Sequence, residues 1–270
     1  MSIKTIPLWK WALLLVVALL LTTFMYGIAM MPGSYLHGWP SWLAALALAP
    51  AMLFLYQMGA KLFEKEWAAD LPMKKCAAHV GLGLAAGFGY MLLVVGVMIA
   101  LDLYSITAYN PQWMPLIDAF FYFLIVATGE EIIFRGVLFR WLDHRWGLGW
   151  ALVISGLLFG LMHIFNDNAT LWSSIAIALE AGILLGMAYK WAGNLWFPIG
   201  IHWSWNFAQG NIFGFAVSGQ DAGSSLFLSS VEGPEWLTGG NFGAEASVIA
   251  TVIGLAFAAF LLRSYLRREA

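Results

Sequence analysis

The sequence predicts an all-α, polytopic membrane helical bundle with about eight transmembrane helices and both termini in the cytoplasm. Hydrophobic residues make up 61% of the 270 residues and charged residues only 10%, whereas a soluble domain carries about 25% charged residues. Such a chain could not cover its own surface with polar groups in water. The mean hydropathy of +0.79 agrees with this, and the 15 Trp and 9 Tyr suit membrane interfaces.

Apolar runs recur along the whole chain. A helix needs about 20 apolar residues to span the hydrocarbon core. The candidate segments are 10–31, 41–62, 79–101, 115–140, 148–165, 171–189, 195–215 and 246–263. Turn-forming residues separate them, as at Met31-Pro32-Gly33-Ser34. We therefore expect residues 1–270 to form a single integral membrane domain.

The distribution of Lys and Arg tests this helix count, because cytoplasmic loops are enriched in them. Twelve of the 13 fall on one side of the predicted membrane: Lys4, Lys10, Lys61, Lys65, Lys74, Lys75, Arg140, Arg145, Lys190, Arg263, Arg267 and Arg268. The opposite loops carry acidic residues and neither Lys nor Arg. The pattern predicts a multi-pass protein of the cell's inner, cytoplasmic membrane and favours a bacterial origin, with the lipid bilayer as its first partner.

The composition also excludes several classes of function. The net charge of −2 implies no nucleic-acid partner. The single cysteine, Cys76, permits neither a disulfide framework nor a cysteine-based zinc site within one chain.

Segment 61–76 could lie on the cytoplasmic interface or form a solvated loop. The outer loop 216–245 could cover a site, although a plain connector is favoured.

Three ionisable residues stand close together in the middle of the fourth apolar segment, in the string GEEIIFRG (129–136). Each costs at least about 2.5–3.5 kcal/mol in mid-membrane, so they should face the bundle interior and be paired. Glu131 and Arg135 are four residues apart and share a helical face, so Arg135 would hold Glu131 and its helix in place. This leaves Glu130 for chemistry, although Arg135 could reach Glu130 instead. A structural Glu–Arg pair is the alternative, but it does not need the second carboxylate.

Two other apolar segments carry histidines. His163 ends the fifth segment and shares a helical face with Phe159, and His202 shares one with Asn206 in the seventh. A lone histidine in an apolar helix is more often a packing residue, but two beside a diacidic helix favour a functional site. Glu180, in the sixth segment, could form a buried hydrogen bond or assist that site.

These motifs resemble those of the CPBP family, the CAAX-processing and bacteriocin-processing intramembrane proteases, also called the Abi family. The matching residues are Glu130, Glu131, Arg135, Phe159, His163, His202 and Asn206. The resemblance covers about 130–206 and is complete at every motif position. It implies an endopeptidase with a catalytic core at about 115–215, buried among the helices. The implied substrates are membrane-associated or lipidated peptides and proteins, and nothing in the sequence selects among them.

Amide hydrolysis needs an activated water, a stabilised oxyanion and a proton for the leaving amine. Glu130 could act as the general base, and His163 could orient the water or carry its proton. His202 and Asn206 offer hydrogen-bond donors for an oxyanion site. Glu130, His163 and His202 could also form a three-ligand catalytic zinc site with one open position, although the HExxH signature is absent.

Linear counting places Glu130 near mid-membrane, His163 toward the outer side and His202 closer to the inner side. These residues have to meet at one depth, which helix tilt or a fourth helix running on to about Trp146 would allow. Two other classes of function stay open. One is a proton-coupled transporter, because intramembrane Glu, Arg and His mark ion pathways. The other is a non-catalytic membrane adaptor or immunity protein, which would not need these polar residues.

Overall fold

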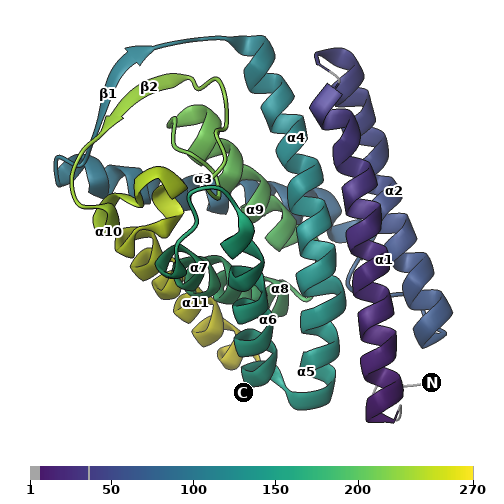
Figure 1. Cartoon of the computed structure of the whole chain (residues 1–270). Coiled ribbons are helices and arrows are strands. Elements are labelled where there is room, and N and C mark those ends of the chain that lie inside the picture. The colour runs from purple at the N-terminus through teal and green to yellow at the C-terminus, as the bar shows by residue number, and fades with distance from the viewer. Residues whose placement is uncertain (1–6, 36, 270) are drawn as a thin grey trace.

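The computed structural model describes residues 7–35 and 37–269 and is mostly helical (Figure 1). Its α-helices are α1 (Leu8–Tyr35), α2 (Trp39–Glu64), α3 (Cys76–Ala100), α4 (Trp113–Glu131), α5 (Arg140–Trp146), α6 (Leu148–Met162), α7 (Leu171–Ile177), α8 (Ile183–Ala192), α9 (Trp196–Phe207), α10 (Glu235–Thr238) and α11 (Val248–Glu269). Three π-helical segments adjoin them: η3 (Ile132–Phe139) joins α4 to α5, η5 (Ala178–Gly182) joins α7 to α8, and η6 (Ala208–Ile212) extends α9. Short 3₁₀ turns are η2 (Met73–Lys75), η4 (His163–Phe165), η7 (Gly240–Phe242) and η8 (Ala244–Ala246).

The helical interpretation is confirmed for the apolar segments. Among the described residues, five helical runs are long and apolar enough to cross a membrane: Trp39–Leu62, Met73–Ala100, Leu148–Phe165, Leu171–Ala192 and Val248–Arg268. The remaining predicted segments are also helical, as α1, the α4–η3–α5 run and α9–η6. α1 continues to Tyr35, through the turn predicted at 31–34. The start of α1 and the end of α11 lie at the same end of the bundle (Figure 1).

A small sheet departs from the all-α prediction. β1 (Tyr104–Tyr109) pairs antiparallel with β2 (Phe227–Val231), at the end of the bundle opposite α5 (Figure 1). Loop 216–245 is therefore more than the plain connector that the sequence favoured. The strands come from distant parts of the chain, so no hairpin turn signals their pairing. The Tyr104 hydroxyl donates to the Phe213 carbonyl at 2.7 Å, which ties the sheet to the end of η6.

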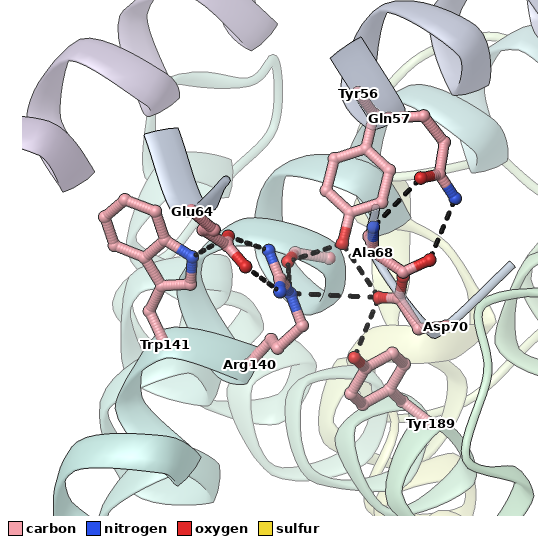
Figure 2. Close-up of polar contacts among 9 residues, drawn as sticks. Tyr56, Gln57, Glu64, Ala68, Asp70, Arg140, Trp141 and Tyr189 are labelled. Atoms are coloured by element: carbon pink, nitrogen blue, oxygen red, sulfur yellow. Dashed lines mark hydrogen bonds and ion pairs between the residues drawn. The ribbon is translucent and has the colours of Figure 1, made fainter. Parts of the chain in front are cut away.

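A polar network closes the α5 end of the bundle (Figure 2). The Arg140 guanidinium donates to both carboxylate oxygens of Glu64, at 2.7 and 2.5 Å, and its Nε lies 4.0 Å from Asp70 Oδ2. The Tyr56 and Tyr189 hydroxyls donate to Asp70 at 2.8 and 2.9 Å. Burial raises the pKa of Asp70, while Arg140 opposes that rise. These bonds hold Glu64 and Asp70, in the connection between α2 and α3, against α5 and α8.

Glycines bring α3 against α9, the helix that carries His202. A Cβ atom added to Gly87 would lie 2.2 Å from the Ile201 carbonyl oxygen, whereas one added to Gly89 would meet nothing within 4 Å. Small residues at such positions let membrane helices approach closely.

We therefore expect Gly87→Ala to destabilise the protein by about 1–3 kcal/mol, the usual cost of overpacking. Gly89→Ala, on the same helix, should leave stability within about 0.5 kcal/mol of wild type. Thermal unfolding in detergent measures both. Equal effects of the two substitutions would contradict the close α3–α9 packing.

Candidate active site

A cavity of about 1010 Å³ lies among α1, α2, α4, α6 and α9 and is bordered by the segment 217–224. Four of the six predicted site residues line it: Glu130, His163, His202 and Asn206. They come from three helical runs: α4, the α6–η4 run (His163 is the first residue of η4) and α9. The other two, Glu131 and Arg135, are fully buried next to the cavity. The structure thus brings together the motifs that the sequence placed on separate helices.

Glu131 is the centre of the buried part of the site. Its Oε1 accepts a hydrogen bond from Arg135 Nη1 at 2.9 Å, which confirms their predicted i,i+4 proximity. The same oxygen lies 2.9 Å from His202 Nδ1. A carboxylate paired with arginine can only accept, so His202 Nδ1 must carry a proton. Glu131 therefore fixes the orientation of the His202 ring, and His202 Nε2 faces away from it.

Arg135 is held by three contacts besides Glu131. Its Nη2 donates to the carbonyls of Ala181 at 2.9 Å and Gly182 at 3.4 Å. Both carbonyls belong to η5, and π-helical segments often occur at functional sites. The guanidinium also lies 4.6 Å from the centroid of the Phe159 ring. This gives Phe159 a role that the sequence analysis missed, since it packs against a cation as well as preceding His163.

Glu130 is the carboxylate that faces the cavity. Its side chain is 19% exposed, in contrast to 0% for Glu131, and its Oε2 lies 3.8 Å from His202 Nε2. The His202 ring therefore stands between the two adjacent carboxylates, with one nitrogen toward each. Tyr26 of α1 lines the same cavity as Glu130. No motif in the sequence pointed to Tyr26.

His163 and Asn206 complete the polar wall. His163 Nδ1 lies 2.7 Å from the Phe159 carbonyl oxygen. Because a carbonyl only accepts, Nδ1 carries the proton, and Nε2 of the neutral ring is left as a hydrogen-bond acceptor. Asn206 is 6% exposed and lies one turn after His202. Both can therefore offer polar atoms to a molecule in the cavity.

The three residues considered for zinc do not form a ligand set in this structure. Among the described residues, no three His, Cys, Asp or Glu side chains are grouped closely enough to hold a metal ion. His202 and Glu130 lie side by side, with His202 Nε2 3.8 Å from Glu130 Oε2, while His202 Nδ1 contacts Glu131.

Glu180 lies outside the cavity lining. The Tyr90 hydroxyl is 2.8 Å from Glu180 Oε2 and 2.9 Å from the Ala250 carbonyl oxygen. Of the two roles left open, the buried hydrogen bond is the one that the structure provides.

Glu245 is a buried carboxylate that sequence reasoning did not single out. It accepts a hydrogen bond from the Ser218 backbone N–H and so anchors the segment 217–224 that borders the cavity. Asn166, the residue after η4, donates from Nδ2 to the Ser218 carbonyl at 2.9 Å. Burial raises the pKa of Glu245 from its ordinary 4.5 to about 7, although the Ser218 hydrogen bond and His202 favour its charged form.

This raised pKa predicts a pH-dependent stability. Ionisation of Glu245 is less favourable in the folded state than in the unfolded state. The stabilisation that protonated Glu245 gives the folded protein is therefore full below about pH 4.5 and is lost as the pH rises through about 7. Between about pH 5 and pH 8, the thermal midpoint of wild type should fall more than that of Glu245→Gln. Parallel midpoints in the two proteins would show that Glu245 does not titrate in this range.

Residues 112–208 match the Rce1-like family of type II CAAX prenyl endopeptidases. The match confirms the resemblance seen in the motifs, and all six predicted site residues lie inside it. This Rce1-like segment covers a little over a third of the chain. No curated protein and no solved structure matches the chain significantly. The family implies a peptide hydrolase, and with the apolar helices it supports a multi-pass membrane protein.

Proposed function

We propose that this protein is an intramembrane endopeptidase that hydrolyses a peptide bond in a membrane-associated substrate, using a water activated by Glu130. The observation that carries the proposal is the convergence of Glu130, His163, His202 and Asn206 on one cavity inside an apolar bundle. A non-catalytic adaptor needs no such convergence. The Rce1-like segment supports the same reaction class.

The proposed mechanism uses the protein's own side chains. Glu130 takes a proton from a water molecule as the oxygen attacks the scissile carbonyl carbon. His163 Nε2, an acceptor in the neutral ring, orients that water. The proton then passes from Glu130 to the leaving amine as the C–N bond breaks, so Glu130 serves first as base and then as acid.

The developing oxyanion needs donors. Asn206 supplies an amide N–H from its buried position. His202 Nε2 donates only when the ring is doubly protonated, because the Nδ1 proton is committed to Glu131. The two carboxylates beside the ring, at 2.9 and 3.8 Å, provide countercharge for that state. Glu131 and Arg135 are positioning residues in this scheme.

The cavity walls indicate how the substrate arrives. Leu158, Leu161 and Met162 of α6 line the cavity, yet they are 39%, 56% and 56% exposed. In a membrane protein such apolar residues face lipid. A substrate with a lipid chain or a transmembrane segment could therefore reach the cavity sideways, between α6 and α1.

We also propose that the eight helical runs all span the membrane, with both termini in the cytoplasm of a bacterial cell. The common position of the start of α1 and the end of α11 supports an even number of spans (Figure 1). The basic residues support the orientation. Lys4 lies outside the described residues.

The test compares wild type with Glu130→Gln in matched membranes. Peptide termini are mapped across the membrane and secreted proteomes of cells expressing each form. Termini that need Glu130 would support the endopeptidase and name its substrate. Identical termini in the two samples, with a phenotype still lost in the variant, would favour the adaptor or transporter.

A further inference from the structure

The two ends of the bundle differ in charge, and contacts between helices define each end. At the basic end, Lys190 Nζ of α8 lies 2.6 Å from Asp143 of α5. The Arg268 guanidinium of α11 lies 4.5 Å from the Trp191 ring. Arg140 pairs with Glu64 at the same end (Figure 2). These contacts join α2, α5, α8 and α11, whose adjoining segments carry most of the Lys and Arg.

The opposite end contains the remaining connections. Asp118 of α4 accepts hydrogen bonds at 2.8 Å from Gly38 N and at 2.7 Å from Trp42 Nε1, which ties the α1–α2 connection to α4. Asn166 donates to Ser218, and Asn110 N donates to the Leu226 carbonyl at 2.8 Å. The segments 32–40, 101–112, 163–172 and 208–247 contain no Lys or Arg. This end is neutral to acidic.

The cavity belongs to the end without Lys or Arg. Its lining includes His37, Asp118, Asn166, Ser218 and Asp221, which come from several connections at that end. It includes no residue from 61–76, 140–147, 190–195 or 263–269, the segments of the basic end. Asp221 is exposed at the rim. The polar mouth of the cavity thus lies on the side away from the basic loops.

We infer that the active site opens to the non-cytoplasmic side of the membrane, and that its substrate is a membrane-anchored polypeptide whose cleaved segment lies at the outer face. The inference rests on the proposed function and orientation. A lipidated tail on the cytoplasmic face would meet the closed, basic end instead. The mouth also carries Asp118 and Asp221 and, among the described residues, neither Lys nor Arg. It therefore suits a neutral or basic peptide segment.

The single cysteine makes a direct test simple. In a Cys76→Ser background, three single-cysteine variants would be made: Asp221→Cys at the mouth, Glu232→Cys on the same end outside the cavity, and Lys74→Cys at the basic end. All three native residues are exposed. Whole cells and permeabilised cells would be treated with a bulky, membrane-impermeant maleimide.

We expect Asp221→Cys and Glu232→Cys to be labelled in intact cells, and Lys74→Cys only after permeabilisation. Labelling of Lys74→Cys in intact cells, with Asp221→Cys protected, would overturn the inference. Labelling of Glu232→Cys alone would overturn it too, because the mouth would then not be open to that side.

A second arm measures the Glu130-dependent termini in labelled, intact cells. Labelled Asp221→Cys should lose cleavage, while labelled Glu232→Cys should cleave like the unlabelled protein. Full cleavage by labelled Asp221→Cys would overturn substrate access through this mouth. If no Glu130-dependent termini exist even in wild type, the proposed protease fails, while the labelling still decides which way the cavity opens.

Discussion

Glu130→Gln should lower the rate of peptide cleavage by about 10²–10⁴-fold, the range that a general acid–base group contributes, with little change in stability. Glutamine keeps the shape of the side chain but cannot take the proton from water. The Glu130 side chain is partly exposed to the cavity, and the nearest ionic partner among the described residues is His202 Nε2 at 3.8 Å. Its replacement therefore leaves no fully buried charge unpaired. Cleavage of an identified substrate by purified protein measures the first effect, and thermal unfolding in detergent the second.

The adjacent carboxylate is the matched control. Glu131→Gln removes the buried partner of Arg135 and of the His202 Nδ1 proton, so it should lower stability as well as activity. Loss of activity alone in Glu130→Gln, and of both activity and stability in Glu131→Gln, would distinguish a catalytic group from a positioning group. If Glu130→Gln retained the wild-type rate, the base would have to be another residue, and the mechanism would be wrong.

Arg135→Met should destabilise the protein by about 3–5 kcal/mol, because removing one partner of a buried ion pair leaves the other charge uncompensated. Arg135 is 1% exposed and Glu131 is 0% exposed. The substitution would also leave the Ala181 carbonyl without its 2.9 Å donor. Arg263→Met, at an exposed position of α11, is the control for the loss of a positive charge and should have little effect. Chemical or thermal unfolding in detergent measures each.

A double variant sharpens this prediction. Glu131→Leu combined with Arg135→Met removes both charges, and replacing a buried pair by apolar residues is often close to neutral. It should be more stable than Arg135→Met alone, which a double-mutant cycle would quantify. A double variant less stable than both single variants would show that the pair is not the main source of the effect.

Much of the fold follows from local patterns in the sequence. The apolar runs set the positions of the helices, and the i,i+4 spacing correctly paired Glu131 with Arg135. The fourth helical run continues through η3 and α5 to Trp146. Such an extension was one of the two ways in which Glu130, His163 and His202 were expected to reach the same depth in the membrane. The structure then places His202 between Glu130 and Glu131, although linear counting put these residues at different depths.

The rest depends on contacts between distant segments, which no local pattern encodes. The β1–β2 pair joins residues more than a hundred positions apart. The Phe159 ring over Arg135, the Tyr26 side chain in the cavity and the Glu245 anchor all arise from packing between helices or loops. The π-helical η5, whose carbonyls receive Arg135, likewise has no signature in the residues Ala178–Gly182.

The enclosed position of α7–η5–α8 has a consequence for the biogenesis of the protein. In its most apolar stretch 72% of the residues are buried, against 28–39% in the other four candidate spans. During synthesis, however, this segment emerges before α9 and α11 exist to enclose it. At that stage the Glu180 carboxylate needs a hydrogen-bond partner that is already in the bilayer. The Tyr90 hydroxyl can be that partner, because α3 is synthesised earlier. The order of the helices along the chain thus allows the Glu180 carboxylate to enter the membrane next to the Tyr90 hydroxyl instead of facing lipid.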